Sequence, residues 1–399
     1  MFLQSLALAT ASLEGAPPPC MEAERSHSHT HAGDEESEGS GPISLELTYT
    51  AEVTGNAAGG LQRGARYLDN FDVVLGADLE RLTGWTGASL GVYGLYNNGN
   101  SISDLVGDAQ AVSNIETGTR AVRLYEAWLD QKIGDKASLR VGLYDLNSEF
   151  DALDASSLFV SSPHGIGTDF AQSGRNGPSI FPSTSLAARL QIEPAEGWVV
   201  RAAILDGVPN DPNRPAHAVI RLGKDEGALL VGEVQAPLAG GEGKVLIGHW
   251  RYTAAFELTD GSGAERGNSG TYIRAELPLA HQPDGKIDGF ARLGTASGRF
   301  NMFDFFASAG LKFTGWIPGR GEDEFGIAVA AAFTAEPYRT LTGASPAEVA
   351  LEATYRTQLT PWLAVQPNLH YIRRPSADPT VADALVLGIR SEISFDLFD

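Results

Sequence analysis

Apolar and polar residues alternate one by one over many short stretches of this chain. In residues 43–53, ISLELTYTAEV, every second side chain is apolar or aromatic and those between are polar or charged. A period of two predicts a strand with one apolar face and one wet face. The same pattern recurs to the C-terminus and predicts about sixteen strands, near 43–53, 66–80, 85–96, 120–132, 137–145, 185–193, 197–205, 227–236, 244–256, 270–279, 286–296, 304–314, 324–333, 348–358, 361–372 and 383–396.

The connections between these predicted strands alternate between tight turns and long segments. Tight turns fall at 82–84, 133–136, 194–197 and 359–361, and long segments at 97–119, 146–184, 206–226 and 334–347. Transmembrane barrels show this alternation, with short periplasmic turns and long external loops, whereas a Greek-key sandwich has no reason to keep it. An even strand number also suits such a barrel, so residues 216–222, AHAVIRL, are assigned to a long loop. The predicted fold class is all-β, a closed antiparallel transmembrane β-barrel.

The charged residues on the wet faces agree with a water-filled interior. An unpaired backbone amide in hydrocarbon costs several kcal/mol, so a spanning sheet must close on itself. Closure at about sixteen strands leaves a lumen too wide for side chains to fill. Aromatic residues near strand ends are expected to form interfacial girdles; they are Tyr49, Trp128, Trp198, Trp250, Tyr252, Tyr355, Trp362 and Tyr371.

Composition narrows the range of partners. The 399 residues contain 29 lysines and arginines against 50 acidic residues, a formal charge of −21, which argues against nucleic acid as a partner. The single cysteine, Cys20, allows no intrachain disulfide, and no run of about twenty apolar residues predicts a transmembrane helix. Residues 43–399 are interpreted as the barrel domain.

Residues 1–42 are interpreted as a leader. Residues 2–12 resemble the apolar part of a secretory signal, although no lysine or arginine precedes them. The acidic stretch that follows is predicted to be a disordered linker. Its histidines, His27, His29 and His31, favour a flexible linker over a metal site because no scaffold fixes their geometry.

Enzyme motifs are absent from the sequence. GASLG at 87–91 matches G-x-S-x-G, but Ser89 lies within a predicted strand with no helix after it. The histidines outside the leader are scattered without zinc spacing, and no phosphate-binding loop occurs. We therefore predict no enzyme, no cofactor and no metal.

Several long motifs carry a family resemblance. In order along the chain they include RLYEAWLDQKIGDKASLRVGLYDLNSEFD, SGRNGPSIFP, LDGVPNDP and LEATYRTQLTPWLAVQPNLHYIRRPSADP. Together with neighbouring stretches over residues 43–396 they resemble the carbohydrate-selective porin (OprB) family. The resemblance implies a sixteen-stranded outer-membrane barrel that passes sugars, with an inward constriction loop narrowing the pore.

Sugar selectivity requires hydrogen-bonding groups in such a constriction. Inward charged residues of the predicted strands are the wall candidates: Glu46, Asp72, Arg140, Arg189, Arg201, Arg274 and Arg292. Each could instead be a wall ion pair that only solvates the lumen. The segment 146–184 is the best candidate for the inward loop, with site candidates Glu149, Phe150, Asp151, Asp169, Arg175, Asn176 and Phe181. The alternative is an external loop with no pore contact.

The sequence thus predicts a passive bacterial outer-membrane porin for monosaccharides or small oligosaccharides. Its partners would be the sugar and outer-membrane lipid, with no nucleic acid, and both a monomer and a homotrimer stay open. Two alternatives also stay open. One is a porin for other small solutes, and the other is a soluble or surface β-protein that binds glycans without transporting them.

Overall fold

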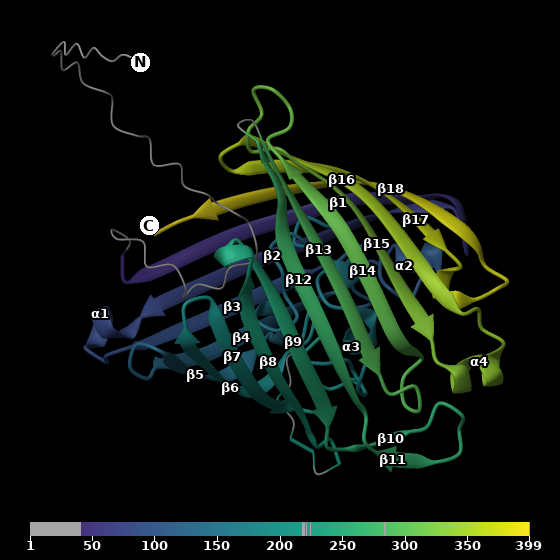
Figure 1. The fold of residues 1–399 in the computed structure, drawn as a ribbon, viewed down its shortest axis with the longest axis horizontal. Coiled ribbons are helices and arrows are strands. Elements are labelled where there is room, and N and C mark those ends of the chain that lie inside the picture. Colours follow the sequence, from purple (N-terminus) through teal and green to yellow (C-terminus); the bar gives the residue numbers. More distant parts are fainter. Residues whose placement is uncertain (1–40, 218–219, 221, 224, 283–284, 399) are drawn as a thin grey trace, which may run out of the picture.

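The computed structural model describes residues 41–217, 220, 222–223, 225–282 and 285–398. The signal-like segment, Cys20 and the three leader histidines lie outside these described residues. Among the described residues, sixteen strands form one closed sheet (Figure 1). In chain order they are β1 (Ile43–Gly60), β2 (Gly64–Asp78), β3 (Ala88–Asn97), β4 (Ala121–Lys132), β5 (Ala137–Tyr144), β6 (Ser185–Ala195), β7 (Trp198–Asp206), β8 (Ala228–Leu238), β9 (Gly243–Tyr252), β12 (Ser269–Gln282), β13 (Gly285–Ala296), β14 (Phe303–Thr314), β15 (Glu324–Thr334), β16 (Ala347–Thr360), β17 (Leu363–Arg373) and β18 (Ala382–Asp396).

The sheet closes where the first strand meets the last. Every strand pairs antiparallel with its neighbour in the chain, and β1 pairs with β18 from Glu46 opposite Asp396 to Gly60 opposite Ala382. In Figure 1 the purple strand β1 accordingly lies beside the yellow strand β18. The predicted barrel is confirmed, and each predicted strand overlaps one observed strand of the barrel. Residues 216–222 form no strand where they are described.

The two faces of the strands differ as the alternation predicts. In β1, Val53 on the outer face is 53% exposed, whereas Thr54 beside it is 1% exposed. Ile204, Ile247 and Leu387 on other strands are likewise large apolar residues with about half of their surface exposed. Because a closed sheet presents this apolar exterior, a soluble sandwich is excluded.

In strand β4, the alternate residues that face the barrel interior change partway along from odd-numbered to even-numbered positions. In β4, Arg123 and Tyr125 are buried before a register shift, and Glu126, Trp128 and Asp130 are buried after it. The shift lies where Tyr93 pairs with Glu126 and Gly94 with Leu124, which leaves Tyr125 as the extra residue of a β-bulge. The bulge explains why large residues alternate irregularly in this stretch of the sequence.

The connections are mostly long at one end of the barrel and mostly short at the other. The short end includes residues 133–136, 196–197 and 361–362, and the helices α1 (Leu79–Thr83) and η3 (Ala239–Gly241) also lie there. Strand β2 stops at Asp78, earlier than predicted, because the Asp78 carboxylate accepts a hydrogen bond from the backbone N–H of Arg81 and caps α1.

The other end carries all the remaining short elements of the described residues. They are α2 (Ser103–Val106), η1 (Leu146–Ser148), η2 (Ser162–His164), α3 (Thr168–Ala171), the hairpin β10 (Ala255–Glu257) with β11 (Ala264–Arg266), α4 (Glu336–Thr342) and η4 (Pro375–Ala377). None of the helices in the described part of the chain has the length and apolar character to cross a membrane.

Three of the expected girdle aromatics lie inside the barrel instead. Trp128, Trp250 and Tyr252 are at most 3% exposed, so the girdle prediction is wrong for them. In β4 the bulge turns Trp128 inward, and Trp250 and Tyr252 pack against the long connection between β5 and β6. Trp198 and Trp362 are on the outside, each more than two-fifths exposed.

Candidate functional site

The connection 145–184 between β5 and β6 folds into the barrel and follows its inner wall. Its backbone N–H groups donate to the carboxylates of glutamates from four strands. Asp145 donates to Glu126 on β4 at 2.7 Å, and Asp151 donates to Glu233 on β8 at 2.8 Å. Further along, Ala155 donates to Glu276 on β12, and Val160 and Ser161 donate to Glu352 on β16. Around the sheet, β4, β8, β12 and β16 come in the same order as their contacts along the segment. The segment therefore crosses a large part of the lumen.

Glu149 from this segment is clamped by a pair of wall arginines. Arg140 and Arg189 are cross-strand partners on β5 and β6. Arg189 donates from Nε and Nη2 to the two carboxylate oxygens of Glu149, both at 2.7 Å. Asp130 on β4 accepts from Arg140 Nε at 2.8 Å and from Arg189 Nη2 at 2.9 Å. Burial raises the pKa of Glu149, but the charges of Arg140, Arg189 and Arg201 outweigh it and hold the pKa at about 2.

A second arginine pair clamps the segment on another part of the wall, five strands further along the sheet. Arg274 and Arg292 are cross-strand partners on β12 and β13, and both are fully buried. Arg292 donates from Nη2 to Asp151 at 2.8 Å and from Nη1 to Asp169 at 2.6 Å. Arg274 donates to the backbone carbonyl of Asp151, to those of His164 and Gly165, and to the Ser156 hydroxyl. Four cationic donors and three carboxylates thus fix the segment.

Burial shifts the pKa of two further side chains of the segment. His164 is 1% exposed, and burial, followed by the charge of Arg274, lowers its pKa to about 3. It is therefore neutral at pH 7. Burial also raises the pKa of Asp169, although the nearby Arg292 guanidinium opposes that change.

Aromatic packing completes the attachment of the segment. Phe170 of α3 stacks on Trp250 of β9, with ring centroids 5.0 Å apart and planes 4° apart. Phe150 is fully buried in the same cluster, which also contains Tyr144 and Tyr272. The Phe150 side chain therefore belongs to the packing beneath the segment.

The connection 98–120 also bends toward the wall. Glu348 on β16 accepts hydrogen bonds from the backbone N–H groups of Ala109 and Gln110 at 2.8 and 3.1 Å. Arg390 on β18 pairs with Glu52 at 2.7 Å and donates to Asn114 at 2.8 Å. Two connections are therefore attached to inward residues on different parts of the wall.

The remaining predicted site residues lie in three settings. Glu46 and Asp72 are on the wall, where Glu46 accepts from the Thr48 hydroxyl and Asp72 from Asn70 and the Tyr93 hydroxyl. Arg201 on β7 is 16% exposed and lies between Gln191 at 2.8 Å and Glu233 at 3.5 Å. Exposed Arg175 donates to the carbonyl of Ala255.

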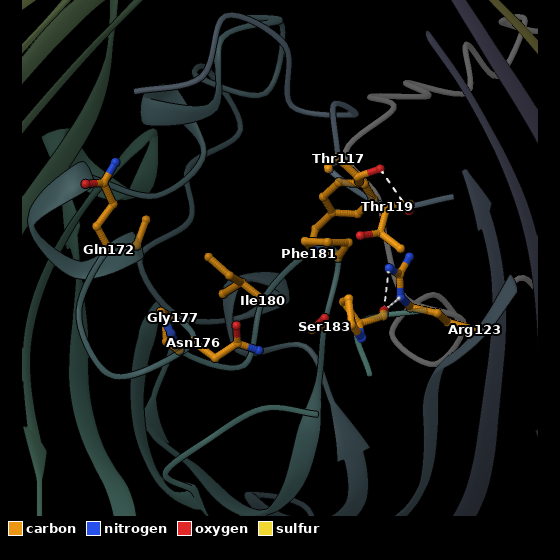
Figure 2. Close-up of a pocket in the computed structure, with 14 residues that line it drawn as sticks. Thr117, Thr119, Arg123, Gln172, Asn176, Gly177, Ile180, Phe181 and Ser183 are labelled. Carbon is orange, nitrogen blue, oxygen red and sulfur yellow. Dashed lines mark hydrogen bonds between the residues drawn. The ribbon is translucent and has the colours of Figure 1, made fainter. Parts of the chain in front are cut away.

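Asn176 and Phe181 lie at a cavity of about 410 Å³ at the long-connection end (Figure 2). Three connections and the start of β4 enclose it. Its lining consists of neutral polar, proline and apolar residues with one arginine: Thr117, Gly118, Thr119, Arg123, Ala171, Gln172, Asn176, Gly177, Pro178, Ile180, Phe181, Pro182, Ser183 and Pro215.

The sequence interpretation missed the acidic residues of the wall that hold the segment. Glu233, Glu276 and Glu352 sit at inward positions of predicted strands, so the period-two pattern could have marked them. Asp130 could not be found in this way because the bulge in β4 reverses the parity that the preceding residues set.

A closed antiparallel barrel with an apolar exterior, a charged interior and an inward connection defines the outer-membrane porin class. The family model of the carbohydrate-selective porins, OprB family, matches residues 62–395, and the chain belongs to this family. It is therefore an outer-membrane channel for carbohydrates.

Individual relatives agree with this assignment. Porin B of Pseudomonas aeruginosa is 24% identical over 401 residues, covering 88% of this chain and 87% of Porin B. The high-pH structure of Pseudomonas putida OprB has a TM-score of 0.77 at 21% identity, covering 89% of this chain and 94% of that one. A triple mutant of the Rhodopseudomonas blastica porin has a TM-score of 0.54 at 9% identity, covering 88% and 100%.

Proposed function

We propose that the lumen passes monosaccharides and small oligosaccharides by passive diffusion through a fixed narrowing formed by residues 145–184. The observation that supports this most strongly is the attachment of the segment to the wall. Glu149 and Asp151 are each held by a buried arginine pair, at distances of 2.7 and 2.8 Å. A narrowing held in this way selects solutes by size and hydrogen bonding and needs no moving gate.

The four buried arginines act in this proposal as positioning residues. Arg140, Arg189, Arg274 and Arg292 are at most 3% exposed, and they donate to the segment, to Asp130 and to Ser138. Arg201 is the predicted wall arginine that keeps part of its side chain accessible. We assign it the direct contact with sugar hydroxyls, since a planar guanidinium offers several donors at once.

Weak binding is part of the proposed mechanism. Sugar hydroxyls exchange hydrogen bonds with water for hydrogen bonds with the wall, at a net gain of about 0.5–1.5 kcal/mol each. A few such contacts favour entry without preventing release. No cofactor, nucleotide or proton transfer enters this account.

Liposome swelling with the purified protein tests the proposal. Rates should be highest for a hexose, lower for a disaccharide and close to zero for a tetrasaccharide. A small dicarboxylate of similar size serves as the comparison solute. Equal rates for the hexose and the dicarboxylate would favour a general porin, and a lack of hexose permeation would refute sugar transport.

A further inference from the structure

The cavity beside Phe181 is assembled from connections that leave the same end of the barrel. Asn176 and Phe181 belong to the connection 145–184, Thr117 to 98–120, and Pro215 to 207–227. Successive antiparallel strands place these three connections at the end with the long loops, which faces the cell exterior in bacterial barrels. The cavity therefore lies where a solute arrives before it meets the fixed narrowing.

Its size and lining suit a small polyhydroxylated molecule. The volume of about 410 Å³ falls in the range of roughly 300–1,000 Å³ that small-ligand sites occupy. In Figure 2, Gln172 lies on one side and Phe181 on the other, with Ile180 between them. Apolar faces beside neutral hydrogen-bonding groups match a sugar ring, which presents C–H faces and hydroxyl edges.

Two amides at the cavity are held in defined orientations. The Asn176 Nδ2 donates to the carbonyl of Pro209 at 2.7 Å, and the Gln172 Nε2 donates to the carbonyl of Ala109. Neither amide oxygen accepts a hydrogen bond from the part of the chain that the structure describes. Both side chains are exposed, so these oxygens can accept hydrogen bonds from ligand hydroxyls.

The charge of the lining argues for an uncharged ligand. Arg123 is the one charged side chain among the described residues that line the cavity. Its Nε and Nη2 both donate to the carbonyl of Pro215, at 3.2 and 2.8 Å, and so hold Pro215 in place. An anion would have to compete for this guanidinium, and a cation would find no carboxylate among these lining residues.

We infer that this cavity is an external docking site for one pyranose ring, with Phe181 as the apolar surface and Asn176 and Gln172 as hydroxyl acceptors. The inference rests on the proposed sugar transport and adds a second binding position to it. Sugar held at the mouth raises its local concentration next to the narrowing. Such a site increases flux at low sugar concentration and saturates at high concentration.

Sugar protection of a single cysteine tests this site. Asn176→Cys is made in a Cys20→Ser chain and treated from outside with a membrane-impermeant methanethiosulfonate reagent, with and without D-glucose. At a glucose concentration about ten times that for half-maximal block of ion current, mass action predicts a roughly tenfold slower modification. Acyclic D-mannitol should protect much less. Leu341→Cys on the external helix α4, which is 64% exposed, is the control whose modification rate should not change.

A second variant tests the apolar surface without emptying the cavity. Phe181→Leu should raise the glucose concentration for half-maximal block of the ion current by roughly three- to tenfold. Unprotected Asn176→Cys together with unchanged block in Phe181→Leu would overturn the docking site. If these variants still pass glucose, that result leaves the transport proposal intact. If the wild-type protein does not pass glucose, both the docking site and the transport proposal are overturned.

Discussion

Asp151 is the residue whose alteration should most clearly release the inward segment. Its carboxylate is fully buried and pairs with Arg292 at 2.8 Å and with Arg274 at 3.3 Å. Asp151→Asn keeps the size of the side chain but removes its negative charge. Arg274 and Arg292 would then be buried next to a neutral amide. Asp169, which pairs with Arg292, would be the carboxylate that remains beside them.

The cost of that change follows from the burial of the pair. Removing one partner of a buried ion pair costs about 3–5 kcal/mol, because the other charge is left uncompensated. The segment can avoid this cost by leaving the wall and hydrating the arginines. Its other attachments, to Glu126, Glu276 and Glu352, oppose that movement, so we expect frequent partial release.

Single-channel recording and liposome swelling measure the release. Asp151→Asn should increase conductance and its fluctuations, and should allow a tetrasaccharide to enter. Asp154→Asn is the matched control on the same segment, since its side chain is 61% exposed and its pair with Lys244 is worth at most about 1 kcal/mol. If the two variants behave alike, the buried pair does not hold the segment, and our explanation of the narrowing fails.

Three other outcomes follow from the same contacts. Arg140→Ala combined with Arg189→Ala should weaken the block of ion current by sugar, because Glu149 loses both of its arginine partners. Unchanged block would mean that these arginines only solvate the wall. Trp250→Ala should destabilise the protein by about 3–5 kcal/mol by removing the stack on Phe170, whereas Trp362→Ala on the outer face should not; heat-modified migration in gels compares them. Acid should loosen the segment. Docked His164 has a pKa of about 3 instead of 6.5, and docked Glu149 about 2 instead of 4.5, so the released segment binds more protons as the pH falls through these ranges. Burial raises the pKa of Asp169, so this residue opposes the trend. Conductance recorded between pH 7 and 3 measures the net effect. Constant conductance over that range would contradict the expected loosening.

The fold could be predicted from the sequence because each strand carries its own signal. Alternation such as that of residues 43–53 depends only on one face meeting lipid and the other meeting water, and every strand repeats it. The alternating lengths of the connections then indicate which connections lie together at each end of the barrel. Prediction went wrong where one residue changes the parity, as at Tyr125 in β4, and where aromatics such as Trp250 serve the interior.

The site could be predicted only in part because its contacts join distant residues. The period-two alternation predicted that Arg140 and Arg292 lie on the inner face. The length of the connection 146–184 marked it as the candidate inward loop. Nothing local indicates that Glu149 would meet the first arginine and Asp151 the second, since these pairs form only when the segment folds across the lumen. The same limit applies to the cavity at Asn176 and Phe181, because residues from three separate connections line it.

Pore sizing with neutral polymers tests the narrowed lumen most directly. Channel conductance is recorded with polyethylene glycols of increasing size, added on each side of a planar bilayer containing the wild-type protein. Polymers larger than a disaccharide should not enter the narrowest part of the pore. They should therefore not reduce the current through it. Free entry of polymers as wide as an empty sixteen-stranded barrel would show that residues 145–184 do not obstruct the pore.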